Sequence, residues 1–368
     1  MSVIKIVLTG GPCAGKTTAL AKTVEYFANH SETKTGVVLL PEAATEIIDA
    51  GLEAGTHGLS RMDFQSALLN LQIAREKIYE EAAAKLDYDN VVLICDRGTM
   101  DNKAFLTPEE FRALAESVGS DEVRLRDRYD AVIHMVTSAK ENKDVYEKYK
   151  SSNPARTETP DEAKEQDDRL ISVWTGHPHL RVVSDLDFDK KIKAVIAEIN
   201  GVLGIPEPLE TERKFLIEYP DTGYLESLPN CRKIEILQTY LKTDDGSEKR
   251  VRQRGENGSY IFIETVKTRI SDLVRTEKER LISPEEYNTL LMQSDPERRP
   301  IRKTRYCLTY ENQYFEIDVY PFWTDKAICE LELSHEDQEI IWPGFLNVIR
   351  EVTEEEEFKN HSLAKLQK

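Results

Sequence analysis

The spacing of hydrophobic and polar positions changes close to residue 200. Before that point, short apolar runs alternate with longer stretches, and the first pair is Val3 to Leu8 followed by Thr17 to Phe27, which contains no Gly or Pro. Continuous apolar runs of this length are typical of parallel strands that are buried on both faces. Further elements are predicted as strands at 36–40, 91–95, 130–137 and 180–184, and as a long helix at 61–86. This alternation predicts an α/β doubly wound parallel sheet.

A short segment then interrupts the pattern. Asn200 to Leu209 contains two Gly and two Pro within ten residues, and neither a helix nor a strand continues through such a stretch. A chain of 368 residues with 40% hydrophobic content can form two cores, at roughly 150 residues per domain. We therefore expect one domain at 1–204 and a second at 205–368.

The second half follows a period of two. Glu210, Glu212 and Lys214 would share one face of a strand, while Phe215 and Ile217 would point the other way. The same step relates residues in six further runs, namely Arg250, Arg252 and Arg254; Thr265 and Lys267; Arg275, Glu277 and Glu279; Lys303 and Arg305; Glu316 and Asp318; and Glu330 and Glu332.

A single charged face is usually the solvated side of a sheet, but seven runs with interleaved signs favour another arrangement. They predict an antiparallel β-barrel of about eight strands whose charged side chains line the interior as a tunnel. The apolar positions on the other face would then pack outward under helices in an α+β domain, and they include Phe315, Ile317, Val319, Leu331 and Leu333.

The charge balance narrows the range of ligands. The formal net charge is −18 with 32% charged residues, which excludes a general nucleic-acid binder and leaves any polyanion site as a local basic pocket. The five cysteines show neither CxxC pairs nor zinc-ligand spacing, so we expect reduced thiols and a cytoplasmic protein. Because no apolar stretch approaches ~18 residues and the first strand begins at Val3, neither a transmembrane segment nor a signal peptide is expected.

The turn between the first strand and the first helix has the sequence GGPCAGKTT, Gly10 to Thr18, which contains GxxxxGK[ST]. The backbone N–H groups of such a loop wrap phosphates, and the positive end of the following helix points at them. Lys16 would reach the β and γ phosphates, and the Thr17 hydroxyl would hold Mg²⁺. The predicted nucleotide-binding residues in this loop are Gly10, Gly11, Gly15, Lys16, Thr17 and Thr18. A base-reading NKxD motif is absent, so ATP and GTP both remain open.

Charged residues follow the next predicted strands. Glu42 comes just after 36–40, and Asp96 and Arg97 come directly after 91–95, where α/β sheets place residues that face a ligand. Asp96 would serve as the carboxylate on the Mg²⁺ side, with a helix N-cap as the alternative. The polar stretch 138–168 contains Arg156, which either closes over transferring phosphate as part of a lid or belongs to a flexible surface loop.

The charged face of the second half suits a chain of phosphates. Arg and Lys neutralise phosphates, and carboxylates hold Mg²⁺ or Mn²⁺, which clamps phosphoryl oxygens. The predicted triphosphate-binding residues are Lys214, Arg250, Arg252, Arg254, Lys267, Arg275, Lys303 and Arg305. The predicted metal-binding residues are Thr17, Asp96, Glu210, Glu212, Glu277, Glu279, Glu316, Asp318, Glu330 and Glu332. The candidate catalytic residues are Glu42, Asp96, Glu210, Glu212, Lys214 and Lys267.

Motifs in the first half resemble a known group of P-loop domains. GGPCAGKTT, PEAA at 41–44, CDRG at 95–98, and NPARTETP followed by VWTGHPHLRV resemble the domain shared by NadR-type nicotinamide-riboside kinases and the insect TRPL translocation defect protein. The resemblance covers most of 1–204. It implies that Glu42 lies near an acceptor hydroxyl or its metal, and that Asp96 and Arg97 lie near the phosphates.

Motifs in the second half resemble the CYTH family, the triphosphate tunnel metalloenzymes. ETERKF at 210–215 resembles the ExExK signature, and RVRQR, TVK, RTEKE, KTR, EID and ELE follow in the order of that family, over roughly 210–366. The family includes tripolyphosphatases, thiamine triphosphatases and adenylyl cyclases, and the shared motifs do not choose among them.

Three functions fit these patterns. In the first, which the complete charge set favours, the tunnel hydrolyses a linear polyphosphate or a nucleoside triphosphate with Mg²⁺ or Mn²⁺, and the P-loop domain is a kinase or NTPase. In the second, the chain is an ATP- or GTP-dependent binding protein for a phosphoinositide, as the resemblance to the insect trafficking protein implies. In the third, the first domain is a small-molecule kinase without an identified acceptor.

Overall fold

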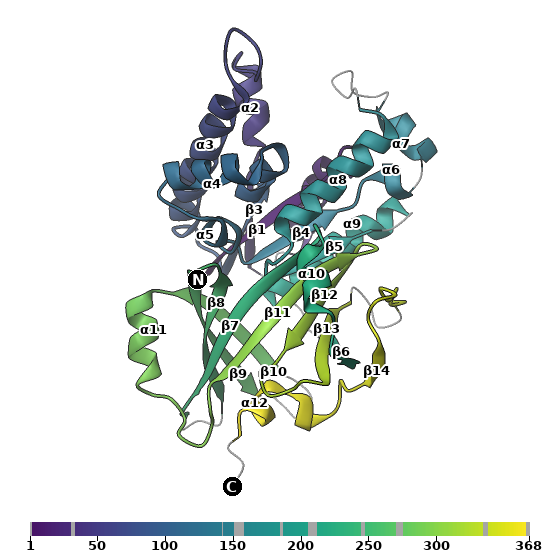
Figure 1. The fold of residues 1–368 in the computed structure, drawn as a ribbon. Helices are drawn as coiled ribbons and strands as arrows, with labels where there is room; N and C mark the ends of the chain where they lie inside the picture. Colours follow the sequence, from purple (N-terminus) through teal and green to yellow (C-terminus); the bar gives the residue numbers. More distant parts are fainter. Residues whose placement is uncertain are drawn as a thin grey trace. The chain divides into compact units, whose positions relative to one another are not determined.

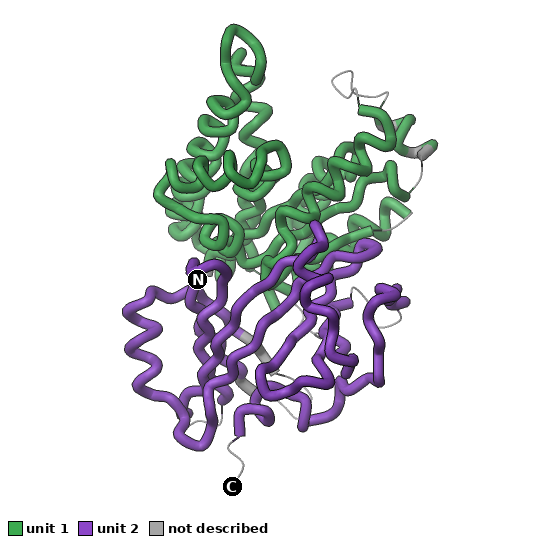
Figure 2. The backbone as a smooth tube through the Cα atoms, in the orientation of Figure 1, with its two compact units in different colours: residues 1–205 green, residues 206–368 purple. Residues whose placement is uncertain are grey.

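The computed structural model describes residues 2–30, 34–141, 143–150, 158–184, 187–204, 212–243, 247–269, 275–333 and 338–365. The chain divides into two compact units, residues 1–205 and 206–368, which Figure 2 shows in two colours. Each unit has its own sheet and is described by itself. Among the described residues, no helix combines the length and the apolar character that crossing a membrane requires.

The first unit alternates strands and helices along the chain, as Figure 1 shows. Its elements are β1 (Ser2–Gly10), α1 (Lys16–Asn29), β2 (Thr35–Leu40), α2 (Ala43–Asp49), α3 (Arg61–Ala83), β3 (Asn90–Asp96), η2 (Thr99–Phe105), α4 (Pro108–Ser117), α5 (Glu122–Arg126), β4 (Ala131–Met135), α6 (Ser138–Glu141), α7 (Lys143–Lys150), α8 (Pro160–Trp174), β5 (Leu180–Val183) and α9 (Phe188–Leu203). The strands pair in parallel in the order β2-β3-β1-β4-β5. The predicted α/β parallel sheet is confirmed.

Helices cover both faces of this sheet. On one face, Ile6 and Leu8 of β1 pack with Phe27 of α1 and Val195 of α9. The residues of β1 and β3 between these apolar positions point the other way, where α8 contacts β1 and α3 contacts β3. The carboxyl ends of all five strands therefore meet at one edge of a fully covered sheet, which is where α/β proteins bind ligands.

Local sequence signals set where the long helices begin. α3 starts after Ser60, whose side chain accepts from the N–H of Asp63 in a reciprocal capping box. α8 starts in the same way after Thr159, and Pro160 occupies its first helical position. The described part of the predicted lid, 138–168, is therefore mostly helical, within α6, α7 and α8, and Arg156 lies outside the described residues.

The second unit is built on an antiparallel sheet. Its elements are β6 (Glu212–Glu218), α10 (Thr222–Ser227), β7 (Cys231–Leu241), β8 (Glu248–Glu256), β9 (Ser259–Arg269), β10 (Arg275–Ile282), α11 (Pro284–Leu291), β11 (Ile301–Tyr310), β12 (Gln313–Val319), β13 (Lys326–Glu332), β14 (Val348–Glu351), η3 (Glu356–Phe358) and α12 (Asn360–Leu363). The strand order is β10-β9-β8-β7-β11-β12-β13-β6-β14. The predicted antiparallel α+β domain is confirmed, with nine strands instead of about eight. Within the described residues no strand pair joins β10 to β14, so closure of the predicted barrel is not observed.

The two faces of this sheet differ as the alternation predicts. Phe315, Ile317 and Leu331 are buried on one face, together with Leu225 of α10 and with Trp342 from the segment before β14. The charged runs occupy the opposite face. An apolar layer under α10 therefore holds the strands together, and this leaves the charged layer available for a ligand.

We predict that Phe315→Ala destabilises the second unit by about 3–5 kcal/mol, because Phe315 is fully buried and its removal leaves a cavity. Urea unfolding followed by tryptophan fluorescence measures this change. Ile341→Ala, at a half-exposed site, should cost less than about 1 kcal/mol. Equal losses in the two variants would show that this face is not the core.

Candidate functional site

The P-loop joins β1 to α1 at the carboxyl edge of the parallel sheet. Gly15 has a φ of 92°, in the left-handed region, and a Cβ there would lie 2.4 Å from the ring of Phe188. Gly10 has a φ of 147°, and its Cβ would lie 2.2 Å from the carbonyl oxygen of Met135. Both positions therefore require glycine. Because the N-cap residue Gly15 has no side chain, the first turn of α1 offers its N–H groups and its positive dipole end to an anion.

Lys16 is the cation of this loop. Its Nζ donates to the carbonyl oxygen of Gly10 at 3.2 Å. Burial, and after it the charge of Arg97, lowers the pKa of Lys16 to about 8. Thr17 and Thr18 follow at exposed positions on the first turn of α1. The loop thus brings together the predicted glycines, the cation and the hydroxyl groups.

Glu42 and Arg97 meet although they follow different strands. Glu42 is the N-cap residue of α2, and its Oε1 accepts from Nε of Arg97 at 2.5 Å. Arg97 has a φ of 68° and also lies 3.5 Å from Oδ1 of Asp101. Burial opposes ionisation of Glu42, but the charges of Arg97 and Lys16 outweigh it and hold the pKa of Glu42 below its usual value. The residue pair is therefore ionised in the ligand-free protein.

Asp101 is a member of this cluster that sequence reasoning missed. Its Oδ1 accepts from the hydroxyl of Thr9, and its Oδ2 accepts from the N–H of Gly98 at 2.8 Å. Gly98 has no side chain for a reciprocal capping box, so the local sequence gave no clear signal for this role.

Asp96 ends β3 and keeps an acceptor atom for a ligand. Its Oδ1 is buried without a hydrogen-bond partner among the described residues. Burial raises its pKa, and the charge of Lys16 opposes that rise. A carboxylate oxygen is the kind of hard ligand that Mg²⁺ prefers.

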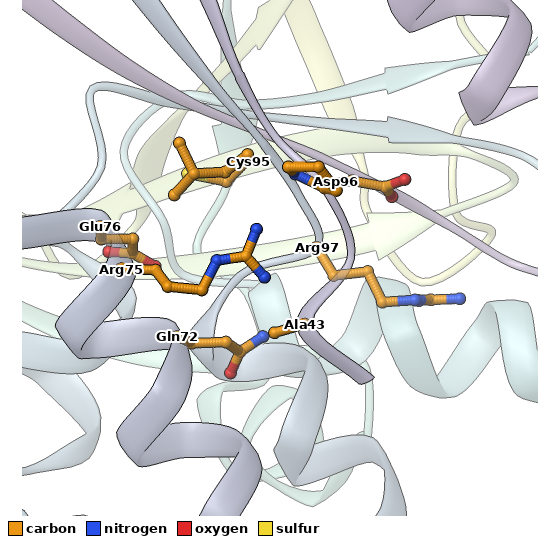
Figure 3. Close-up of a pocket in the computed structure, with 9 residues that line it drawn as sticks. Ala43, Gln72, Arg75, Glu76, Cys95, Asp96 and Arg97 are labelled. Atoms are coloured by element: carbon orange, nitrogen blue, oxygen red, sulfur yellow. The ribbon is translucent and has the colours of Figure 1, made fainter. Parts of the chain in front are cut away.

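A small pocket lies beside this cluster, at the carboxyl ends of β2 and β3 (Figure 3). Three of its residues come from one side of α3, and the others come from the ends of the two strands and the start of α2. The lining residues are Leu40, Pro41, Ala43, Gln72, Arg75, Glu76, Cys95, Asp96 and Arg97. Arg75, one of the lining residues, pairs with Glu46 at 2.9 Å.

In the second unit, strand pairing places the charged runs on one face. Lys214 lies opposite Glu330, and Glu330 lies opposite Glu316. Arg305 lies opposite Asp318 on the next pair of strands. On β7, Ile236 lies on the same face, opposite Lys303 of β11 and Arg254 of β8. Arg250 of β8 lies opposite Thr265 of β9, and Thr265 lies opposite Glu279 of β10, so the face extends to β10. The described candidates therefore share one side of the sheet.

Arg305 is the centre of this charged face. Its guanidinium contacts three carboxylates: Asp318 at 2.7 Å, Glu330 at 2.6 Å, and Glu316. Asp318 also pairs with Lys303, and Glu330 also pairs with Nζ of Lys214 at 2.7 Å. On the other side of the face, Glu279 pairs with Arg252 and lies 3.8 Å from Arg250. Acids and bases thus neutralise one another in the ligand-free protein.

The pKa shifts follow from these contacts. Burial opposes the charged form of Glu330, but Lys214 and Arg305 outweigh it and hold the pKa of Glu330 well below its usual value. Burial acts against the charge of Lys214 too, but Glu330 and Glu212 raise its pKa overall. Lys303 behaves differently, because burial and the charge of Arg305 lower its pKa. An additional anion beside Lys303 would favour its charged form.

The carboxylates include an acceptor for a metal. Oε1 of Glu316 is buried without a hydrogen-bond partner among the described residues. Within that part of the chain, no three or more Asp, Glu, His or Cys side chains converge as a complete metal site. Glu210 lies outside the described residues, and the side chains of Arg275 and Glu277 are likewise not described. The oxygen chemistry fits Mg²⁺ or Mn²⁺, and the described carboxylates are at present paired with Lys and Arg.

Two features of this face were not expected from the charge pattern. Gln238 of β7 lies opposite Arg252 and is buried, and its Nε2 has no hydrogen-bond partner among the described residues. At one end, an apolar cluster formed by Tyr240, Ile301 and Ile328 packs against Phe358 and Ala364 near the C-terminus. The charged face is therefore bounded on one side by the C-terminal segment.

The geometry of the first unit defines a class of protein. A strand, a Gly-rich loop with Lys16, and a helix that starts at that lysine form a P-loop nucleotide-binding domain. A family model described as an AAA domain matches residues 5–189, half of the chain. The chain belongs to this family.

Comparison with solved structures finds several similar proteins. The hypothetical protein NE1496 is 30% identical over 42% of this chain and 97% of its own, with a TM-score of 0.31. A second structure, of the inorganic triphosphatase NE1496, has the same identity over 42% and 93%, with a TM-score of 0.30. The thymidylate kinase from Ehrlichia chaffeensis is 16% identical over 55% and 100%, with a TM-score of 0.36. No curated protein matches the chain.

We predict that nucleotide affinity falls as pH rises above about 8, because Lys16 then loses the proton that pairs with phosphate. From pH 7.5 to pH 9 the Kd for Mg·ATP or Mg·GTP should rise about eightfold. Titration calorimetry in two buffers of different ionisation enthalpy should also detect proton uptake on binding at pH 8.5. A Kd that is constant over this range would contradict the lowered pKa.

Proposed function

We propose that the second unit hydrolyses a triphosphate, either tripolyphosphate or a nucleoside triphosphate, with a divalent metal. The observation that carries this proposal is the charged face itself. Cations and carboxylates alternate on one side of a single sheet, and the apolar core lies on the other side. A face that only needed solvation would not require Lys303 and Asp318 to be buried.

In the proposed mechanism, the basic side chains exchange their carboxylate partners for phosphate oxygens. Phosphate oxygens take the places that carboxylates now hold around Arg305, Lys303 and Arg252, and bidentate contacts from the arginines orient the chain. The carboxylates of Glu316 and Glu330 are then available to hold Mg²⁺ or Mn²⁺ together with Glu212. The bound metal would neutralise phosphoryl charge and position the attacking water. Lys214 and Lys267 are proposed to stabilise charge on the transferred or departing phosphate.

For the first unit we propose binding of ATP or GTP and transfer or hydrolysis of its terminal phosphate. A small-molecule kinase is a second candidate, which the pocket beside Glu42, Asp96 and Arg97 favours. In that role Glu42 would accept the proton of an acceptor hydroxyl, while Arg97 and Lys16 would hold the phosphate.

Other predictions from the sequence gain no support from the described residues. Binding of a phosphoinositide, a role in trafficking and a cytoplasmic location all stay predictions. The resemblance to the nicotinamide-riboside kinase and the insect translocation protein also stays at that level, because the family match is to an AAA domain in general.

We predict that Glu330→Gln lowers tripolyphosphate turnover on the order of 100-fold, because the change removes a charge between Lys214 and Arg305. Glu264→Gln is a matched control. Glu264 is an equally buried carboxylate in ion pairs on the same sheet, but it lies with Lys249 and Arg280 on the opposite face. That control should change turnover by less than about threefold. Phosphate release with Mg²⁺ and with Mn²⁺ measures both.

The same assay separates the two units. Lys16→Ala should leave tripolyphosphate turnover intact, whereas the double change Glu210→Ala/Glu212→Ala should abolish it. The opposite pattern would move the chemistry to the P-loop. If wild-type protein releases no phosphate from tripolyphosphate, ATP, GTP or thiamine triphosphate with either metal, the proposed hydrolysis by the second unit is wrong.

A further inference from the structure

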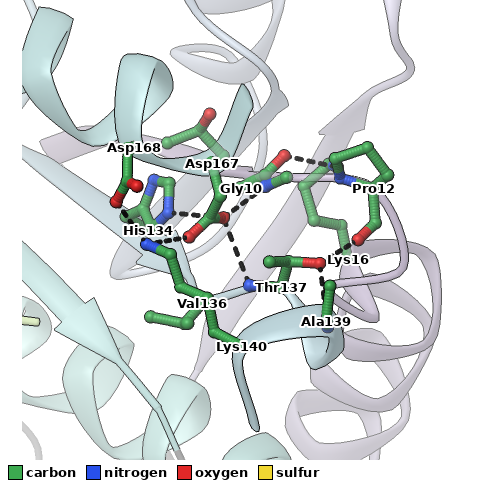
Figure 4. A network of polar contacts seen from close by, with 12 residues as sticks. Gly10, Pro12, Lys16, His134, Val136, Thr137, Ala139, Lys140, Asp167 and Asp168 are labelled. Carbon is green, nitrogen blue, oxygen red and sulfur yellow. Dashed lines mark hydrogen bonds and ion pairs between the residues drawn. The ribbon is translucent and has the colours of Figure 1, made fainter. Parts of the chain in front are cut away.

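A buried carboxylate on α8 contacts the start of the P-loop (Figure 4). The charge pattern of the sequence did not indicate this contact. Asp167 is fully buried. Its Oδ1 accepts from the N–H of Gly11 at 2.8 Å and from the N–H of Thr137 at 3.1 Å, and it lies 3.0 Å from Nε2 of His134. Its Oδ2 lies 2.9 Å from Nζ of Lys140. One side chain thus joins the P-loop, the end of β4, α6 and α8.

The carboxylate is held in its ionised form. Burial opposes ionisation, but the contacts with His134 and Lys140 outweigh it and keep the pKa of Asp167 far below its usual value. Lys140 contacts a second carboxylate as well, Oδ1 of Asp168 at 2.6 Å. A buried anion with three hydrogen-bond contacts and one ion pair is strongly constrained in position, because moving the side chain would leave the N–H groups of Gly11 and Thr137 without this partner.

A second set of contacts holds the carbonyl groups of the same loop. The Thr137 hydroxyl donates to the carbonyl oxygen of Pro12, and the Ser138 hydroxyl donates to that of Cys13 at 3.1 Å. In a trans peptide the carbonyl C=O and the following N–H point in opposite directions. Because the Pro12 oxygen points toward Thr137, the N–H of Cys13 points away from Thr137. A phosphate cradle needs this arrangement, because a carbonyl oxygen that faced the ligand would repel it.

The contact between Asp167 and Gly11 also explains a glycine. A Cβ on Gly11 would lie 2.7 Å from Oδ1 and 2.9 Å from Cβ of Asp167. The second glycine of GGPCAGKTT is therefore needed for close approach to α8. It is not an element of the GxxxxGK[ST] pattern, which specifies Gly10 and Gly15 only.

We propose that Asp167 is a positioning residue for the nucleotide site. It fixes the peptide planes of the P-loop before a nucleotide arrives. The proposal rests on the nucleotide-binding role of the P-loop. It assigns Asp167 no contact with the phosphates.

The test measures the loop directly, without a ligand. Hydrogen–deuterium exchange of peptides that cover residues 10–18 is compared in full-length wild type, Asp167→Asn and Leu170→Ala. Leu170 is fully buried on the same helix, so its truncation weakens α8 packing without removing a hydrogen bond to the loop. We expect exchange in the loop to rise on the order of tenfold in Asp167→Asn and to stay unchanged in Leu170→Ala.

Nucleotide affinity gives a second readout. The Kd values for Mg·ATP and Mg·GTP, measured well below the unfolding temperature, should rise on the order of tenfold in Asp167→Asn and change less than about twofold in Leu170→Ala. A residue with only a structural role would lower the unfolding temperature and leave Kd unchanged. That result would overturn the proposal.

A milder variant keeps the test decisive if Asp167→Asn does not fold. Thr137→Val removes the hydroxyl that donates to the Pro12 carbonyl oxygen. It retains the backbone N–H of residue 137, which donates to Asp167. It should also raise exchange in the loop, and unchanged exchange in this variant would refute the proposed network. If wild-type protein binds neither nucleotide, the nucleotide-binding function fails, while the exchange comparison still decides whether Asp167 organises the loop.

Discussion

Charge that is removed from water must be neutralised, and this constraint governs both units. Arg305 is surrounded by three carboxylates, and Arg97 lies between Glu42 and Asp101. Asp167 has three hydrogen-bond contacts and an ion pair with Lys140. Each of these groups would be too costly to bury alone. The ligand-free protein therefore keeps these groups ionised by pairing them with neighbouring charges and donors. In the proposed function, a phosphate ligand would replace the internal partners of Arg305 and Arg97, so its net affinity would be the difference between two sets of ion pairs.

This exchange differs between the two sites. The P-loop offers backbone N–H groups and the end of a helix, whose partial charges need no counterion and are fixed by the fold. The charged face of the second unit offers full side-chain charges, which must be held in place by Glu330, Glu316 and Asp318 until a ligand replaces them. In the proposed function, a divalent metal at the second site would give the displaced carboxylates a new partner while the phosphates occupy the arginines.

Periodic features were predictable from the sequence, and single contacts were not. The five parallel strands, the P-loop and the shared face of the charged runs follow from local spacing, because a period of two or a Gly-rich turn has a direct geometric meaning. Asp101, Asp167 and Gln238 carry no such signal. Asp101 contacts Thr9 and Asp167 contacts Gly11, which lie far away in the chain, and a single polar residue on a helix or strand is ordinarily solvated. Whether the nine strands close into a barrel was also not predictable, because alternation fixes faces but not closure, and within the described residues no closure is observed.

Asp167 shows how the two kinds of information combine. The motif specifies that Gly10 and Gly15 must adopt conformations that other residues avoid, and this makes the loop flexible in the unfolded chain. Flexibility alone would make nucleotide binding costly, because the loop would have to be ordered each time a ligand arrived. Hydrogen bonds from Gly11 to Asp167, and from Thr137 to Pro12, order it in advance. The glycines make the conformation possible, and a buried carboxylate from another helix makes it the populated one.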